Sequence, residues 1–315
     1  MNIKSILLFL MCITLQKVAA KEIDTTAAIS IGGIQQFISI KGKSTDNPIL
    51  LYLHGGPGAA VSSHSDKVTQ RLEAHFVVVH WDQRGSGKTI ALNEPDALPT
   101  IEVMKQDAEE VFSYLLTRFD RKQIVVLGNS WGTVLGLHLA EKFPVKVRSF
   151  IAVSPIVQHK KSQEITLELL QNHFNKNDNT KALEQLSTVK IPFENAEQML
   201  ILHRWETVHN GEDFPDEQYK QYLSYFVGWS SQWMPLYQQL YGIDLEKQVL
   251  ELECPVYVLI GDKDLTTHHE ITKAYFDVLK APQKELFWLE DVGHNIPGVA
   301  GDRMQEIIIE NIIND

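Results

Sequence analysis

Short, largely apolar segments recur along the chain, and the stretches between them carry apolar residues at helical spacing. These segments cover residues 49–53, 76–80, 124–127, 147–153, 255–260 and 285–289. Strands without polar alternation are buried on both faces, so such strands joined by helices predict a mainly parallel sheet covered on both sides. Residues 29–31 and 37–40, separated by Gly32-Gly33, predict an additional antiparallel pair. We therefore expect an α/β fold.

The predicted helices divide the chain. They cover residues 102–119, the stretch from the 124–127 strand to Lys142, 270–279 and 303–313. From Ile156 to about Val249 the pattern is almost wholly helical, and Pro155 and Pro255 bracket this part. The simplest organisation is one core, residues 21–155 and 250–315, with a helical cap inserted at residues 156–249.

Composition and charge exclude several classes of protein. With 315 residues, 44% hydrophobic and 22% charged, the chain can bury a large core and is not expected to be disordered. Its net charge of −11 disfavours attraction to nucleic acid or to an anionic membrane. No phosphate-loop lysine pattern and no metal-ligand spacing of histidines is evident, so we predict neither a nucleotide nor a metal cofactor. The sequence leaves the oligomeric state open.

The N-terminus has the layout of a secretory signal peptide. Lys4 precedes an apolar run at 6–15, and small residues precede a cleavage site after Ala20. Loss of residues 1–20 would change the net charge to −13 and leave Cys254 as the one cysteine, so no intramolecular disulfide is expected. We predict export if the segment is cleaved and a cytoplasmic location otherwise. No later segment is long enough to predict stable membrane insertion.

Gly128-Asn129-Ser130-Trp131-Gly132 lies where a predicted strand meets a predicted helix. A Gly-x-Ser-x-Gly sequence there predicts a tight, strained turn that lifts the serine hydroxyl above the end of the sheet. The alternative is a plain turn with an idle serine. Ser130 is the candidate nucleophile, and the N–H of Trp131, at the start of the helix, is a candidate donor to an oxyanion.

A serine nucleophile needs a base and an acid that orients the base. His294 alone among twelve histidines follows a late predicted strand and precedes the last helix, so it is the predicted base. Asp264 follows the 255–260 strand and is preferred as the acid over Asp262, which lies closer to the strand. Asp291 is a weaker substitute for the same role.

The second oxyanion donor is expected from the glycine-rich loop after the 49–53 strand. Glycines there allow the backbone to approach a substrate oxygen closely. Gly56 is the predicted donor and Gly55 the alternative. His54 is expected to make structural hydrogen bonds and not to serve as a second base.

Taken in order, these residues resemble the α/β-hydrolase superfamily. The matching segments are LHGGPG at 53–58, WDQRGSGKT at 81–89, GNSWGTVLG at 128–136, GDKD at 261–264 and GHN at 293–295. HGGPG with DQRGSG, and a tryptophan after the serine, is similar to the proline iminopeptidase branch. The resemblance implies release of an N-terminal residue, typically proline, through an acyl-enzyme. It also implies that Asp82 and Arg84 brace the turn beside the loop that carries Gly55 and Gly56, with a direct catalytic role for Arg84 as the alternative.

The resemblance further implies a glutamate in the helical cap, often after a tryptophan, that binds the substrate's α-amine. Trp205 and Glu206 match best, although Glu206 could be an exposed carboxylate paired with Arg204. The aromatic segment 219–241 lacks the second cap acid usual in the family, and Lys88 stands where arginine is common. These departures keep open a carboxylesterase or amidase of the same fold. A non-catalytic binding protein is the remote alternative.

Overall fold

The computed structural model describes residues 21–94 and 98–313; the predicted signal peptide at 1–20 lies outside them. The described residues form one eight-stranded sheet in the order β1-β2-β4-β3-β5-β6-β7-β8. The strands are β1 Ile23–Ile31, β2 Ile34–Gly42, β3 Ile49–Leu53, β4 Val77–Asp82, β5 Ile124–Asn129, β6 Val147–Val153, β7 Val256–Gly261 and β8 Lys284–Leu289. β1, β2 and β4 pair antiparallel, whereas all pairs from β4–β3 to β7–β8 are parallel.

Helices cover both faces of this sheet. α2 (Ile101–Arg118), α3 (Trp131–Lys142) and α9 (His269–Val278) contribute to the hydrophobic cluster on one face, while α1 (Ser65–Thr69) and α11 (Gly301–Asn311) contribute to the other. A short helix, α10 (Ile296–Val299), precedes α11, and short 3-10 turns cover Ser62–His64, Gln70–Ala74, Gly87–Leu92 and Leu240–Gly242. The predicted two-sided covering of the sheet is therefore observed.

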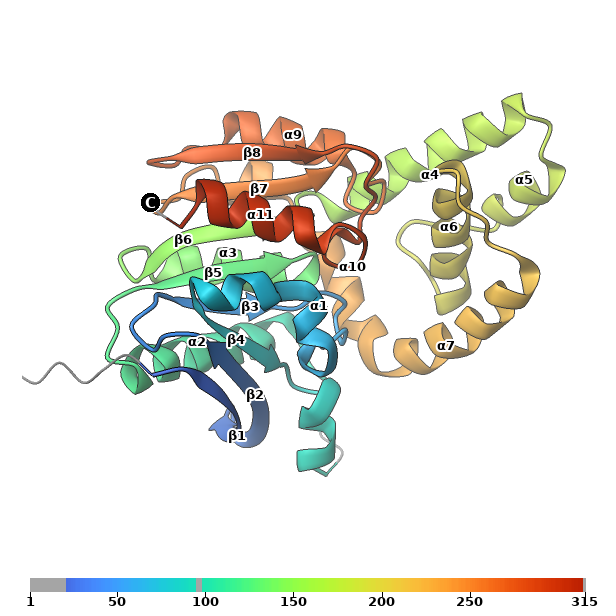
Figure 1. Cartoon of the computed structure of the whole chain (residues 1–315). Helices are drawn as coiled ribbons and strands as arrows, with labels where there is room; N and C mark the ends of the chain where they lie inside the picture. Colours follow the sequence, from blue (N-terminus) through green and yellow to red (C-terminus); the bar gives the residue numbers. More distant parts are fainter. Residues whose placement is uncertain (1–20, 95–97, 314–315) are drawn as a thin grey trace, which may run out of the picture.

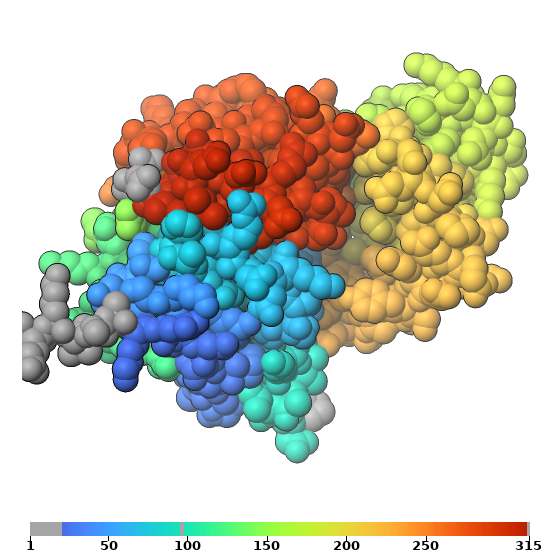
Figure 2. Space-filling view, viewed as in Figure 1, coloured from blue at the N-terminus to red at the C-terminus, as the bar shows by residue number. Residues whose placement is uncertain are grey.

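Five helices lie between β6 and β7, in the range predicted for an insertion. They are α4 (His159–Lys176), α5 (Thr180–Leu186), α6 (Ala196–His209), α7 (Asp216–Gln239) and α8 (Leu245–Gln248). Helices α4 to α7 form a lobe beside the sheet (Figure 1), and the space-filling view shows this lobe as a separate bulge next to the core (Figure 2). We refer to this lobe as the cap.

The first and last residues of two buried strands, β3 and β6, were predicted correctly. The antiparallel pair is longer than predicted, because β1 alternates exposed and partly buried positions over most of its length. An edge strand of this kind lacks a continuous apolar run, so only its last residues, 29–31, were predicted as a strand. Within the described ranges, no helix combines the length and apolar character that a membrane crossing requires.

Candidate active site

The turn between β5 and α3 holds Ser130 in a strained conformation, with φ 50° and ψ −116°. A positive φ is unusual for a residue other than glycine and costs free energy, so the surrounding structure must hold Ser130 in this conformation. The two flanking glycines allow it. A Cβ on Gly132 would overlap the carbonyl oxygen of Leu53, and one on Gly128 would lie 2.5 Å from the carbonyl oxygen of Gly132. Larger side chains would force this turn open.

Ser130, His294 and Asp264 come together at this turn from three distant parts of the chain. Ser130 Oγ lies 2.9 Å from His294 Nε2, and His294 Nδ1 lies 3.0 and 3.1 Å from the two carboxylate oxygens of Asp264. With the Nδ1–H donating to the carboxylate, Nε2 is free to accept the serine proton. The distances are those required between a nucleophile, its base and the orienting acid.

The other two candidate acids lie elsewhere. Asp262 accepts a hydrogen bond from the N–H of Val292 at 3.3 Å, and exposed Asp291 pairs with Lys263 at 3.1 Å. Asp264 is fully buried and also accepts hydrogen bonds from the N–H and hydroxyl of Thr267, at 3.0 and 2.9 Å. These donors keep the acid ionised and fixed in place.

Charges in the site shift the pKa values in the direction that this chemistry needs. Burial alone would raise the pKa of Asp264, but the His294 ring and the Thr267 donors lower it to about 2. Burial alone would lower the pKa of His294, but the Asp264 carboxylate and its hydrogen bond raise it. Asp264 therefore stays charged at neutral pH, and a charged carboxylate at this position is able to stabilise a positive charge on the His294 ring.

Two candidate oxyanion donors border the same place. Trp131 is the first residue of α3, so its N–H has no preceding intrahelical carbonyl to bind. Gly55 and Gly56 line the cavity that contains Ser130. Gly56 has φ 111°, and a Cβ there would lie 2.6 Å from the nitrogen of Gly58, so this loop accepts only glycine at that position.

Gln83 connects the 55–58 loop to α3, and this role of Gln83 was not predicted from the sequence. Its amide NH₂ donates to the carbonyl of His54 at 3.3 Å, and its Oε1 accepts from the Trp131 indole N–H at 2.8 Å. His54 is buried, donates from Nδ1 to the Gly55 carbonyl at 2.8 Å, and accepts at Nε2 from the Gln83 N–H at 3.3 Å. Burial lowers the pKa of His54 to about 4. Its contacts fit the structural role predicted for it.

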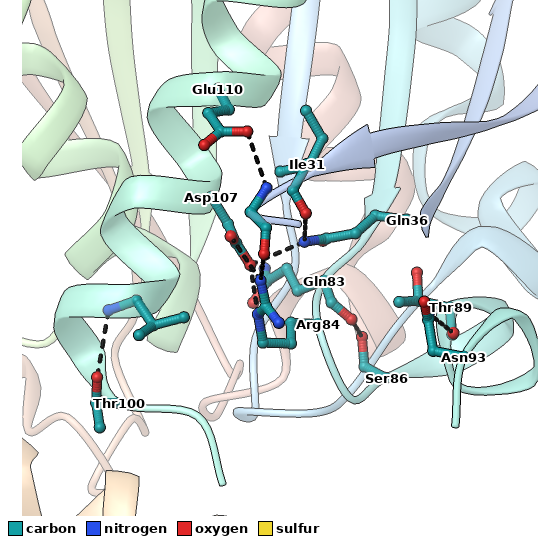
Figure 3. Close-up of polar contacts among 12 residues, drawn as sticks. Ile31, Gln36, Gln83, Arg84, Ser86, Thr89, Asn93, Thr100, Asp107 and Glu110 are labelled. Carbon is teal, nitrogen blue, oxygen red and sulfur yellow. Dashed lines mark hydrogen bonds and ion pairs between the residues drawn. The ribbon is translucent and has the colours of Figure 1, made fainter. Parts of the chain in front are cut away.

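Arg84 lies behind this connection, in a buried network drawn in Figure 3. Its guanidinium contacts both carboxylate oxygens of Asp107 on α2, at 2.8 and 3.1 Å, and the carbonyl of Gly32 at 2.7 Å. Gln36 donates to the same carboxylate at 2.8 Å. Asp82 accepts from the N–H of Lys88 at 2.8 Å. The turn that carries Gln83 is thus fixed to α2 and to the turn between β1 and β2, as expected for a brace.

A cavity of about 620 Å³ lies between the core and the cap, and Ser130 and His294 line it. Glu206 of α6 lines the same cavity and is 7% exposed. Among the described residues that line it, Glu206 is the one carboxylate. The Thr266 hydroxyl donates to it at 3.0 Å, and burial raises the pKa of Glu206 to about 7. Arg204, the alternative partner, pairs instead with Asp216 at 2.6 Å.

Trp205 does not line the cavity, so the structure separates it from Glu206. Its indole N–H donates to Gln185 Oε1 at 2.9 Å, and its ring packs edge-on against Phe174 inside the cap. Neighbouring residues on a helix point about 100° apart, which explains why only one of the pair faces the cavity. The substrate-binding role predicted for Trp205 is not supported by this position.

The aromatic side chains of α7 have different surroundings in the structure. Three side chains line the cavity: Tyr222, Phe226 and Tyr237. Trp229 and Trp233 instead contact the 55–58 loop, which carries the candidate oxyanion donor, and the 83–89 turn, and Tyr225 is exposed. Lys88, noted for its departure from the family, lies over the Phe37 ring at 4.5 Å. Its charge is therefore outside the cavity.

A model described as the alpha/beta hydrolase fold matches residues 48–299. The chain belongs to the α/β-hydrolase fold family. Its relatives include the probable aminopeptidase YbaC of Bacillus subtilis, 27% identical over 87% of this chain and 92% of that one. A proline iminopeptidase of Lactobacillus delbrueckii subsp. lactis is 28% identical over 84% of this chain and 90% of its own.

Solved structures of other proteins share this α/β-hydrolase fold. A proline iminopeptidase-related protein from Thermus thermophilus has a TM-score of 0.63 at 19% identity, over 91% of this chain and 98% of its own. A putative lipase from Acinetobacter baumannii has a TM-score of 0.65, also at 19% identity, over 92% and 91%. At this identity the likeness establishes the fold alone. The resemblance to the proline iminopeptidase branch is supported by the sequence relatives.

Proposed function

We propose that this α/β hydrolase is a serine aminopeptidase that releases an N-terminal proline or another small residue from peptides. The observation that carries the proposal is the position of Glu206: a buried carboxylate with a single hydroxyl partner faces the cavity that contains Ser130 and His294. A charged α-amine is the group that would best compensate such a carboxylate.

In the proposed reaction, Ser130 attacks the carbonyl of the first peptide bond while His294 takes its proton. The N–H groups of Gly56 and Trp131 stabilise the oxyanion. His294 then returns the proton to the leaving amine, an acyl-enzyme forms, and water attacks it by the same route. Asp264 orients the ring throughout. Glu206 holds the α-amine two bonds away from the reacting carbonyl.

The cavity has room for the peptide beyond the cleaved bond. Asn295, Pro297 and Gly298 follow His294 and line the cavity together with Lys67 and Val68 of α1. Since His294 must reach the leaving nitrogen, the leaving chain extends toward this side, away from the cap residues near Glu206. A volume of about 620 Å³ is typical of sites that hold several substrate groups.

A carboxylesterase or amidase is the second candidate. It is favoured by the scarcity of cap carboxylates, since the 219–241 segment provides none and Glu206 is the one acid among the described residues lining the cavity. An aromatic wall with a largely uncharged surface would also admit an ester without an amine.

One substrate pair separates the two functions. Proline anilide and its N-acetyl form should be compared with wild-type enzyme and with Ser130→Ala. An aminopeptidase cleaves the free-amine substrate and refuses the blocked one, an amidase accepts both, and an esterase cleaves a neutral ester but neither anilide. If Ser130→Ala still turns over either substrate, Ser130 is not the nucleophile and the proposed mechanism is wrong.

We also propose that the enzyme is exported, and this proposal depends only on the signal-like sequence of residues 1–20. Mass spectrometry of the protein purified from its native host should give an N-terminus at Lys21 if the segment is cleaved. An N-terminus at Met1 or Asn2 would contradict export by this signal.

A further inference from the structure

The cap helix α7 is attached directly to the loop that carries the candidate oxyanion donor. The indole N–H of Trp229 donates to the carbonyl of Pro57 at 2.8 Å. One turn further along, the amide of Gln232 donates to the carbonyl of Gly85 at 2.9 Å. The helix thus contacts both the 55–58 loop and the 83–89 turn that braces it. Gly56, the predicted donor, directly precedes Pro57 in the chain.

The ring of Trp233 tightens the same contact. A Cβ on Gly58 would lie 2.5 Å from Trp233 Nε1, and one on Gly85 would lie 3.4 Å from the edge of this ring. Trp233 is 3% exposed, so its ring fills the space between α7 and the two glycine-rich turns. The oxyanion loop is therefore held from the core by Gln83 and from the cap by α7.

Trp229 also contacts the wall of the cavity. Its ring centroid lies 6.2 Å from that of Phe226 and 5.7 Å from that of Tyr237, and both of these side chains line the cavity. A substrate residue packed against Phe226 and Tyr237 therefore rests on the side chains that contact the indole bound to the Pro57 carbonyl.

We propose that Trp229 is a positioning residue that holds the Gly56 N–H in place for the oxyanion and links its placement to occupancy of the aromatic wall. The inference rests on the proposed serine chemistry, but it is independent of whether the substrate carries an amine. Specific binding in the cap would then favour catalysis in the core, because both use the same indole.

Trp229→Phe tests this inference, since it removes the N–H and retains an aromatic ring. Loss of one donor to the loop should lower kcat about 5- to 10-fold, less than the 10²–10³ typical of deleting an oxyanion donor itself. The loss should be the same for proline anilide and for a neutral ester. A peptide boronate, which forms a tetrahedral adduct on serine, should bind more weakly by a similar factor. Inhibition by free proline, a ground-state ligand, should change less than twofold.

Trp288→Phe is the matched control, because Trp288 is 43% exposed on β8, outside the cavity; it should leave all four measurements unchanged. Gln232→Met gives a second variant if Trp229→Phe does not fold, with a smaller loss in the same pattern. Unchanged kcat, or equal weakening of the boronate and of proline, would overturn the inference. Turnover in Ser130→Ala would instead overturn the proposed function.

Discussion

Replacing Glu206 by Gln tests amine recognition directly, because the substitution removes a charge and little else. The side chain keeps its shape, and the amide oxygen can still accept the hydrogen bond that Thr266 donates at 3.0 Å. The free-amine substrate loses its ionic partner, whereas a neutral ester has none to lose. We expect a selective loss for the free-amine substrate.

The size of the loss follows from burial. A hydrogen bond to a charged group contributes about 1.5–3 kcal/mol, and Glu206 lies in a largely dry site at 7% exposure. At about 1.4 kcal/mol for each factor of ten, kcat/KM for proline anilide should fall roughly 10- to 150-fold. For a neutral ester, kcat/KM should change less than about threefold.

The pH dependence gives the same test a second readout. Burial raises the pKa of Glu206 to about 7, so the wild-type carboxylate becomes available for an amine as the pH rises through about 7. His294 titrates for every substrate, so its contribution cancels in the ratio of kcat/KM for the anilide to kcat/KM for the ester. This ratio should rise with pH up to about 7 in the wild-type enzyme, below the pKa of about 8 at which the substrate amine loses its proton, and should show no such rise in E206Q.

The measurement is a set of initial rates for both substrates between pH 5 and 8, with Glu197→Gln as a control for a carboxylate on α6 that is not among the cavity-lining residues. An equal loss for both substrates, or the same pH-dependent ratio in E206Q as in wild type, would refute amine binding by Glu206.

Further predictions concern stability and the elements around Ser130. Because the pKa of Glu206 is raised on folding, the cost of its ionisation to stability is absent below about pH 4 and complete above about pH 7. E206Q should therefore be more stable than wild type by about 3 kcal/mol at pH 8 and equally stable at pH 4 in urea titrations. Gly132→Ala should cost more than about 2 kcal/mol and most of the activity, since its Cβ would clash with the Leu53 carbonyl, whereas Gly228→Ala on α7, with nothing within 4 Å, should gain about 0.5–1 kcal/mol. Asp107→Asn should lower the free energy of unfolding by about 3 kcal/mol by breaking the buried pair with Arg84; a loss below about 1 kcal/mol would contradict the bracing role. Asp264→Asn should lower kcat by roughly 10⁴-fold at unchanged fold by circular dichroism, and a loss under tenfold would contradict its orienting role.

The parts of this site that sequence could predict are those whose chemistry requires a fixed chain order. A strand, a tight turn and a helix locate Ser130, and parallel strands bring the loops after β7 and β8 to the same edge of the sheet. Asp264 and His294 follow from that topology, and the structure brings both to Ser130. The resemblance to a known family placed Glu206 in the cap.

Side-chain direction within the cap was less predictable, because it depends on packing between helices. Trp205 and Glu206 are adjacent in sequence, yet one fills the interior of the cap and the other faces the cavity. Helical periodicity describes which residues share a face but does not say what that face touches.

The aromatic residues of α7 also show that the sequence predicts a helix face but not its partners. Phe226, Trp229, Trp233 and Tyr237 recur at spacings of three and four residues, so sequence assigns them to one face of a helix. In the structure this face meets two partners, the cavity and the glycine-rich turns of the core. The second contact depends on Gly58 and Gly85. A side chain at Gly58 would displace the Trp233 ring, and one at Gly85 would clash with the Gln232 amide. Glycines in the core motifs therefore leave room for the cap helix, and this gives α7 a direct contact with the loop that carries the candidate oxyanion donor.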